Sequence, residues 1–259
     1  MNIPRLPLLL VTLALPVMLS SGAQAQGGAG APAAPPPTPR ASAPIDLSGN
    51  WVAVITEDWR WRMVTPAKGD YASVPLNVEG KRVADTWDPA KDEAAGEQCR
   101  SYGAPGLMRA PTRLRVTWLD DATLKIESDH GIQTRLLQFR AARAAAAAPS
   151  WQGVSAAQWV FAAGGGGRGR GAARRGSMKS VTTRLRPGFL RKNGVPYSAN
   201  ATFTEYWDVH TESNGDTWMV VTNVVDDPTY LQTPWVTSVH FKKEADGGKW
   251  DPTPCSARF

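Results

Sequence analysis

Short segments in which apolar and polar residues alternate recur from Ile45 onward, and they constrain the fold more than any other feature of the chain. A period of two places successive side chains on opposite faces of a β-strand, whereas a helix needs a period of 3.6. Turn-forming residues such as Asn214 and Gly215 separate several of the segments. We therefore expect an all-β protein with strands at 51–56, 59–64, 113–118, 123–128, 132–139, 179–186, 202–209, 218–225 and 235–242.

The gaps between these segments predict how the strands connect. Most gaps are hairpin-sized, so we expect an antiparallel up-and-down meander. Eight or nine such strands can close into a barrel, which leaves no exposed sheet edge. Residues 77–96 are polar and indicate a short helix or a lid, and residues 140–177 are rich in Ala, Gly and Arg. We expect a barrel of 8–9 strands with these two loop insertions, the second flexible and of low complexity, with a possible strand around Trp151 and Trp159.

The first 44 residues have the composition of processing and linking segments. Residues 1–25 combine a basic start, an apolar run over 6–19 and a small-residue cleavage pattern, which predicts a signal peptide. Residues 26–44 are mostly Gly, Ala and Pro and predict a disordered linker. Residues 45–259 then form a single barrel domain. Because no apolar run approaches about 18 residues, we expect a periplasmic or secreted bacterial protein with no membrane span.

The net charge of +6 does not indicate a nucleic-acid surface on the folded domain. Seven basic and no acidic residues lie from Arg140 to Lys179; the charge is −1 without them and −3 without Arg5 and Arg40 as well. The Gly/Arg tract at 164–171 resembles RGG-type nucleic-acid segments. In an exported barrel we interpret it as a loop tip, and we expect no nucleic-acid partner.

The chain has two cysteines, Cys99 and Cys255. In an oxidising compartment an even pair predicts one disulfide. The alternative is a catalytic thiol, and no nearby histidine supports it.

Eleven tryptophans are spread along the domain. Large amphipathic rings fill an all-β core, and they also line cavities for apolar or aromatic ligands. Both interpretations stay open at this point. The candidates for ligand contact are Trp59, Trp61, Trp207 and Trp218.

Charged residues on apolar strands give the candidate site. In the expected strand 59–64, alternation places Asp58, Arg60 and Arg62 on one face, which is either solvated or lines the barrel. Glu205 shares a face with apolar residues, so it is either paired with an arginine or poised as a general acid/base. The arginines able to bind a carboxylate of a ligand are Arg60, Arg62, Arg135, Arg184 and Arg186.

Two loops are rich in turn residues and basic residues. The first runs over 97–105 and leads into Met108-Arg109-Ala110-Pro111, and the second runs over 186–198. Both are candidates for the rim of a barrel mouth, where ligands usually enter. Only His130, His210 and His240 are present as histidines, and no metal-ligand spacing occurs. We expect no metal and no cofactor.

The first strand opens with Gly49-Asn50-Trp51, and this Gly-x-Trp resembles the start of the first strand in lipocalins and the wider calycin group. The resemblance implies a lipocalin-like barrel whose closed end is crossed by the Trp51 indole, with Lys242, Lys243 or Arg258 stacked on it. It also implies a calyx for small hydrophobic molecules. Some calycin-like barrels are hydratases, isomerases or lyases without cofactors. The two loops and the ending at 252–255 resemble a group of exported bacterial proteins, and that resemblance supplies no function.

Three functions are compatible with these features. The leading hypothesis is an exported lipocalin-like protein that binds a small hydrophobic or aromatic molecule in a barrel cavity. The alternative is a cofactor-free lyase, isomerase or hydratase with Glu205 or Asp58 as acid/base and an arginine that stabilises negative charge. The third is an envelope scaffold that uses the Ala/Gly/Arg-rich insertion as its contact. The sequence sets no oligomeric state.

Overall fold

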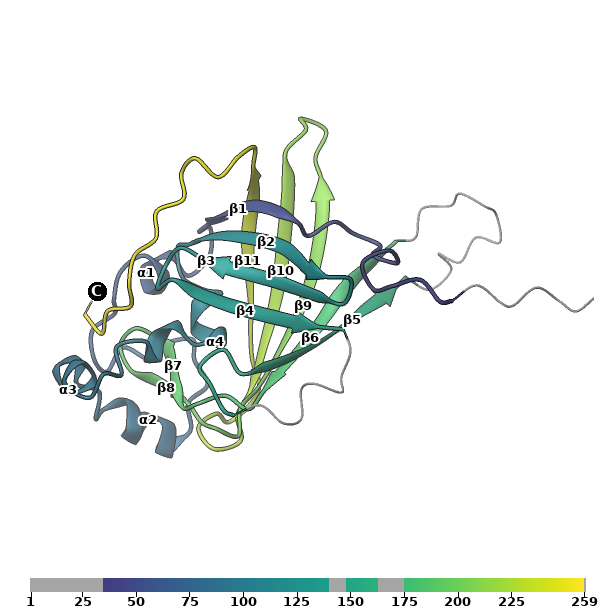
Figure 1. Ribbon diagram of the computed structural model, residues 1–259. Coiled ribbons are helices and arrows are strands. Elements are labelled where there is room, and N and C mark those ends of the chain that lie inside the picture. Colours follow the sequence, from purple (N-terminus) through teal and green to yellow (C-terminus); the bar gives the residue numbers. More distant parts are fainter. Residues whose placement is uncertain (1–34, 140–147, 163–174, 259) are drawn as a thin grey trace, which may run out of the picture. The chain divides into compact units, whose positions relative to one another are not determined.

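A computed structural model describes residues 35–139, 148–162 and 175–258 (Figure 1). The predicted signal peptide, the first part of the predicted linker and two parts of the predicted insertion lie outside these residues. The chain from Pro37 onward forms one compact unit. Part of the expected linker belongs to it, because the Pro39 carbonyl accepts a hydrogen bond from the Trp159 indole at 2.7 Å and the Arg40 amide bonds to the Asp121 carbonyl.

Nine strands of the described chain form one closed barrel, which confirms the predicted fold class. Their spatial order is β1-β11-β10-β9-β6-β5-β4-β3-β2, and the ring closes where β1 pairs with β2. The strands are β1 (Gly49–Val54), β2 (Arg113–Asp120), β3 (Thr123–Ser128), β4 (Gln133–Gln138), β5 (Val154–Phe161), β6 (Gly176–Thr183), β9 (Thr202–Thr211), β10 (Thr217–Asp226) and β11 (Trp235–Glu244).

The barrel departs from a pure antiparallel meander at one place. β4 and β5 pair in parallel through Leu137 opposite Ser155 and Gln138 opposite Ala156. A parallel pair needs a crossover of about a dozen residues or more, and residues 139–153 supply that length. The stretch expected as a flexible insertion therefore contains β5, a strand that closes the barrel, and the start of β6.

The segment predicted as a strand at 59–64 is instead a single helical turn, so that prediction is wrong. Asp58 adopts a left-handed conformation with φ 52°, and its carbonyl accepts hydrogen bonds from the amides of Trp61 and Arg62. These local bonds satisfy the backbone without a partner strand. The expected two-face alternation of Asp58 to Met63 does not occur.

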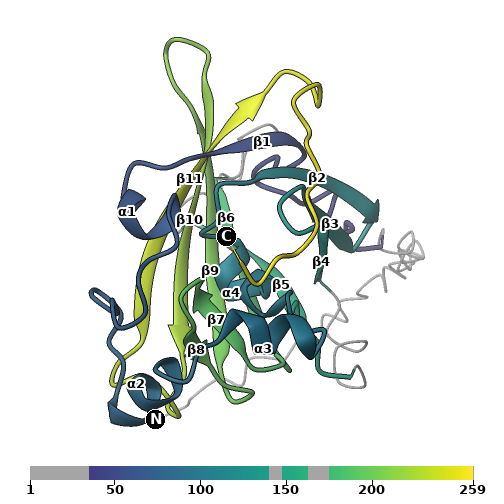
Figure 2. The same ribbon diagram turned by 90° about the vertical axis from the view of Figure 1, so that its left-hand side faces the viewer.

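Short helices and a two-stranded sheet gather at one end of the barrel (Figure 1; Figure 2 shows this end face on). The polar stretch 77–96, expected to hold a short helix or a lid, forms two of the helices, and the side chains of Asn77 and Asp88 cap them. The elements are α1 (Trp59–Arg62), α2 (Val78–Ala84), α3 (Pro89–Ala94), the 3₁₀ turn η1 (Arg100–Tyr102), α4 (Ala104–Leu107), β7 (Gly188–Arg191) and β8 (Val195–Tyr197).

Of the three basic residues considered as partners of Trp51, Lys243 is the one that lies over its ring. Trp51 is buried, and Lys243, its partner across β1 and β11, lies with Nζ 5.3 Å from the centre of the indole ring. Gly49 has φ 123°, and a Cβ at this position would lie 2.8 Å from Lys243 Cε. The glycine therefore admits both the backbone conformation and the stacked lysine.

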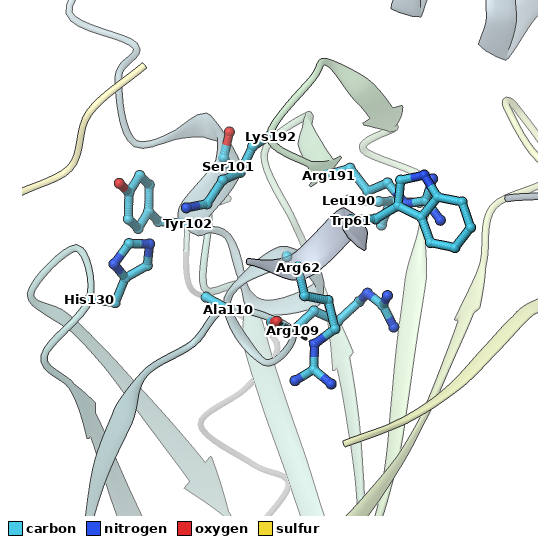
Figure 3. Close-up of a pocket in the computed structure, with 11 residues that line it drawn as sticks. Trp61, Arg62, Ser101, Tyr102, Arg109, Ala110, His130, Leu190, Arg191 and Lys192 are labelled. Carbon is cyan, nitrogen blue, oxygen red and sulfur yellow. Dashed lines mark hydrogen bonds between the residues drawn. The ribbon is translucent and has the colours of Figure 1, made fainter. Parts of the chain in front are cut away.

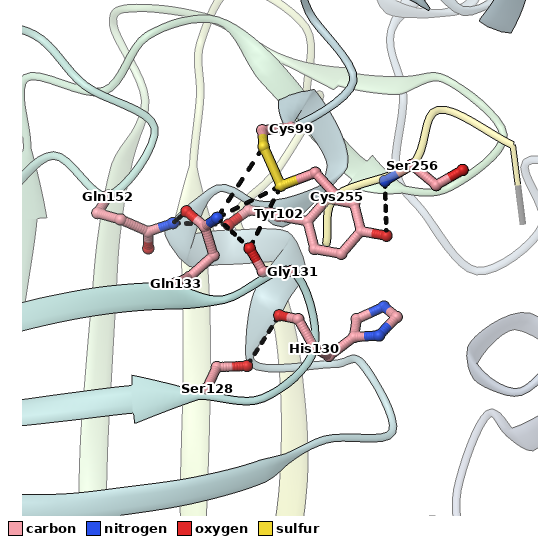
Figure 4. The surroundings of a disulfide bond; sticks show 9 residues. All are labelled: Cys99, Tyr102, Ser128, His130, Gly131, Gln133, Gln152, Cys255 and Ser256. Carbon is pink, nitrogen blue, oxygen red and sulfur yellow. Dashed lines mark hydrogen bonds between the residues drawn. A yellow bond between two sulfur atoms is a disulfide. The ribbon is translucent and has the colours of Figure 1, made fainter. Parts of the chain in front are cut away.

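The disulfide between Cys99 and Cys255 is formed, as predicted. It fixes the C-terminal segment beside η1 and the β3–β4 turn (Figure 4). There the Thr253 amide also donates a hydrogen bond to the Asp129 carbonyl. The Ser256 amide also donates to the Tyr102 hydroxyl at 3.2 Å. Within the described residues, no helix is long and apolar enough to cross a membrane.

Candidate functional site

Inside the barrel, Arg135 and Glu205 form a fully buried ion pair. Arg135 donates from Nη1 and Nη2 to the two Glu205 oxygens at 2.9 and 2.6 Å. Ser180 also donates to Glu205, at 3.0 Å, and accepts the Trp207 indole N–H at 3.1 Å. Arg135 lies on the buried face of β4, and Glu205 lies with its apolar neighbours on the buried face of β9. Because both carboxylate oxygens are occupied, the arrangement is that of the structural pair rather than of a poised acid.

Several other candidate residues lie apart from one another on the surface. β6 ends at Thr183, and Arg184 is exposed with φ 56°, so the alternation expected to continue through Arg186 stops there. Arg186 pairs with Glu97 and stacks over Trp151 at 4.4 Å. Trp59 is 63% exposed, and Trp218 is half-buried beneath Lys242.

A pocket at the end of the barrel brings together residues of α1, η1, α4, β7 and the β3–β4 turn (Figure 3). Of the candidates, Arg62 and Trp61 line it; the other cationic residues lining it are Arg109, Arg191 and Lys192. Figure 3 shows Trp61 and Arg191 on one side, Tyr102, His130 and Lys192 on the other, and Arg62 and Arg109 between them. We call this the arginine pocket.

Arg62, Arg109 and Arg191 are each held by at least one hydrogen bond. Arg62 donates from Nε to the Arg109 carbonyl at 2.8 Å and from Nη1 to Glu57. Arg109 donates from Nη2 to Asp58 at 2.8 Å. These contacts explain why the Arg62 guanidinium points inward from α1. They also place Asp58 at the edge of the arginine pocket.

Arginine and tryptophan side chains alternate beside the pocket. The guanidinium carbon of Arg191 lies 4.8 Å from the Trp61 ring centre and 5.8 Å from that of Trp235. Arg109 stacks on Trp235 at 4.7 Å, and Arg60 lies 5.1 Å from Trp61. Stacked rings stabilise the cations and hold them in fixed orientations. Arg60 is at the exposed end of the row, where it pairs with Asp70.

Arg191 differs from the other two pocket arginines because it pairs with no carboxylate of the described residues. It is 4% exposed, and its one hydrogen-bonded side-chain partner is the Ser73 hydroxyl, which Nη2 reaches at 2.7 Å. Its Nε and Nη1 have no partner, nor do Arg62 Nη2 and Arg109 Nη1. Buried donors are normally satisfied, so this concentration of unsatisfied N–H groups makes the pocket a candidate anion site.

Burial and mutual repulsion lower the pKa values of the pocket arginines. Loss of solvation, aided by the Arg109 charge, lowers the pKa of Arg62 and that of Arg191 to about 10 each. Burial also lowers the pKa of Arg109. All three remain cationic at neutral pH, so the pocket keeps a strong positive potential.

A second, wider cleft adjoins the arginine pocket, and Tyr102, His130 and Lys192 line both. Burial lowers the pKa of Lys192 to about 8, and burial together with the Lys192 charge lowers the pKa of His130 to about 4. The far wall of this outer cleft contains Met63 and Val64, both exposed, and residues 253–258 of the disulfide-fixed C-terminal segment.

Sequence reasoning selected the two loops that carry Arg109, Arg191 and Lys192 as rim candidates, but it did not select these residues or His130. The positions of the two loops indicated where the pocket would form. The sequence contains no pattern that predicts that three distant arginines converge there. Within the described residues, no group of three His, Cys, Asp or Glu side chains is placed to hold a metal ion.

Comparison of the chain with protein-family models, with curated proteins and with solved structures finds no match.

Proposed function

We propose that this protein is a lipocalin-like, exported binder of a small molecule that carries a carboxylate on an apolar or aromatic body. The carboxylate would lie in the arginine pocket and the body in the outer cleft. The observation that carries the proposal is Arg191, a buried guanidinium without an anionic partner among the described residues. The Gly-x-Trp resemblance and the contact of Trp51 with Lys243 support the lipocalin-like assignment.

Energetics favour an anion at Arg191. Burial of an unpaired charge costs several kcal/mol, whereas a charge-assisted hydrogen bond from an arginine to a carboxylate neutralises the charge and satisfies a buried donor. Nε and Nη1 of Arg191 are both unpartnered, and because their N–H bonds lie on different sides of the guanidinium, each can donate a separate hydrogen bond to an anion. The neighbouring N–H groups of Arg62 and Arg109 add to the positive potential.

The size of the arginine pocket favours a carboxylate over a phosphate. The volume open to the centres of water molecules is about 20 Å³, which is room for about one or two waters. A planar carboxylate places two oxygens in such a space, whereas a tetrahedral phosphate needs room for four. The outer cleft offers about 390 Å³ by the same measure, enough for the rest of a small ligand.

This proposal places the ligand at the barrel end rather than beside Arg135 and Glu205. At the level of that ion pair the interior is occupied by packed side chains, including Phe203 and Trp207. Glu205 has no acid/base role in the proposal because Arg135 and Ser180 occupy its oxygens. Asp58 serves to hold Arg109.

Calorimetric titration with benzoate tests the proposal. Arg191→Met should weaken benzoate binding by about 10- to 100-fold, the range expected for lost charge-assisted hydrogen bonds. Arg60→Met removes the exposed arginine of the same stacked row, which pairs with Asp70 at the surface, and should change binding by less than about threefold. Benzamide, a neutral analogue of the same shape, should not compete.

Two results would reject the proposal. One is an unchanged benzoate affinity in the Arg191 variant. The other is a wild-type protein that shows no saturable binding of benzoate.

A further inference from the structure

Glu57 connects the arginine pocket to the outer surface of the barrel. One oxygen of its carboxylate, Oε1, accepts a hydrogen bond from Arg62 Nη1. The other oxygen, Oε2, lies 3.1 Å from Nδ1 of His240, a residue of β11 whose side chain is 33% exposed. The Thr56 hydroxyl also donates to Oε2, at 2.6 Å. One carboxylate is therefore shared between a buried cation of the pocket and a histidine that solvent reaches.

The charge of Glu57 acts on more of the pocket than Arg62 alone. Loss of solvation lowers the pKa values of Arg62 and Arg109, and the negative charge of Glu57 acts against that fall at both residues. Glu57 thereby offsets part of the positive charge that would hold an anionic ligand. Arg62 Nη2, on the same guanidinium as the bond to Glu57, has no partner. Any change that draws the Glu57 charge away from Arg62 leaves the pocket more positive.

We propose that His240 regulates the arginine pocket, so that the affinity for a carboxylate ligand rises when this histidine gains a proton. This inference rests on the proposed carboxylate site. Histidine is the side chain that ordinarily changes charge between pH 8 and pH 5. A protonated His240 forms an ion pair with Glu57 Oε2, and the shared carboxylate then neutralises less of the Arg62 charge. The imidazolium also adds one positive charge to the row of groups that ends in the pocket.

The groups that surround His240 on the outer face of the barrel leave Glu57 as its ion-pair partner. The strands on either side, β1 and β10, present valines in register with it. On β11 itself the next residue of that face, Lys242, pairs with an aspartate of the β9–β10 turn at 2.8 Å. Asp208 of β9 lies in the same row but one strand further away, beyond the valine of β10. The carboxylate that contacts the imidazole is that of Glu57.

The pH dependence of benzoate binding tests this inference. Calorimetric titrations between pH 7.5 and 5.5 keep the ligand ionised, since carboxylic acids titrate near pH 4. The wild-type protein should bind benzoate at least about fivefold more tightly at pH 5.5 than at pH 7.5, which is the lower end of the coupling usual between two sites. At pH 6.5 binding should also take up protons, and titrations in buffers of different ionisation enthalpy measure that uptake.

Two other titratable residues of the pocket do not produce this signal. Burial lowers the pKa of His130 to about 4 and that of Lys192 to about 8. At pH 6.5 His130 is therefore neutral and Lys192 is cationic, both before and after an anion binds. Proton uptake at this pH thus reports on a group outside the lining of the pocket.

Three variants separate His240 from the rest of the surface. His240→Gln keeps a hydrogen-bonding group beside Glu57 but gains no charge, so it should bind benzoate within about twofold at both pH values, without proton uptake. His240→Lys carries a permanent charge and should show at both pH values the affinity that the wild type has at pH 5.5. His210→Gln removes an exposed histidine of β9 that pairs with Glu212 at 3.2 Å, and it should keep the full pH dependence.

The failure of this inference is distinguishable from failure of the proposed function. If benzoate binds through Arg191 but the affinity of His240→Gln changes with pH as much as that of the wild type, regulation by His240 is rejected and the carboxylate site stands. If the wild type shows no saturable binding at either pH, the carboxylate site is rejected and the regulation, which depends on it, falls with it.

Discussion

Arg135 and Glu205 face each other inside the barrel as a bidentate ion pair, with neither side chain exposed to solvent. They come from β4 and β9, strands that are not neighbours in the barrel, so the pair crosses the interior. Ser180 and Trp207 extend the pair into a chain of hydrogen bonds. The two charges therefore tie opposite walls of the barrel together.

We expect removal of one partner of this pair to be more damaging than removal of both. Glu205→Gln leaves the buried Arg135 charge uncompensated and should lower the free energy of unfolding by about 3–5 kcal/mol. The double variant Arg135→Met, Glu205→Leu removes both charges and should be more stable than Glu205→Gln. Urea denaturation followed by tryptophan fluorescence measures all three proteins. A double variant less stable than the single one would contradict the structural role.

We expect Gly49→Ala to destabilise the barrel more than Gly215→Ala does. Both glycines have positive φ, 123° and 88°, so both substitutions carry backbone strain of about 1–2 kcal/mol. Only at Gly49 would the new Cβ meet the Lys243 side chain. Moving that lysine would break its contact with the Trp51 ring, which is worth about 0.5–1 kcal/mol. Thermal unfolding of the two variants should show this difference, and equal losses would argue against the Gly-x-Trp packing.

We expect loss of the disulfide to weaken both the fold and the outer cleft. The double variant Cys99→Ser, Cys255→Ser opens a long loop and should lower the free energy of unfolding by up to about 5 kcal/mol. It also frees the segment that supplies Thr253, Pro254 and Ser256 to the outer cleft. At a temperature where the variant stays folded, benzoate titration should show weaker binding than in wild type. Unchanged affinity would mean that this wall does not contact the ligand.

We expect the free energy of unfolding to fall in mild acid because of the buried His130. Burial holds its pKa near 4, below the ordinary histidine value of 6.5, so the folded state resists protonation that the unfolded state accepts. Its contribution is fully present above pH 6.5 and is lost as the pH falls from 6.5 toward 4. His130→Gln should flatten that part of the dependence of unfolding free energy on pH. Parallel curves for variant and wild type between pH 7 and 5 would contradict the assignment.

The barrel was predictable from the sequence because alternation and turn residues act locally. The strands expected at 113–118, 123–128 and 202–209 are present, and Glu205 faces inward as its apolar neighbours indicated. The strand expected at 59–64 is absent, and the alternation of residues does not reveal the reason. The left-handed Asp58 starts a helical turn there, and no strand of the barrel pairs with it.

The arginine pocket was only partly predictable. Arg62 and Trp61 were selected, although for the wrong local structure. Arg109 and Arg191 lie in loops whose turn residues indicate exposure, and only the packing of Trp235 and Trp61 around them buries their charge. Net charge was also a poor guide, because a slightly acidic domain concentrates three arginines in one pocket, where Glu57 and Asp58 pair with only two of them.

A crystal structure of the protein with benzoate tests the central claim most directly. The account predicts a carboxylate oxygen within about 3 Å of Arg191 Nε or Nη1, with the phenyl ring extending toward the outer cleft. Benzoate bound elsewhere, with Arg191 still bonded to Ser73 alone, would contradict it.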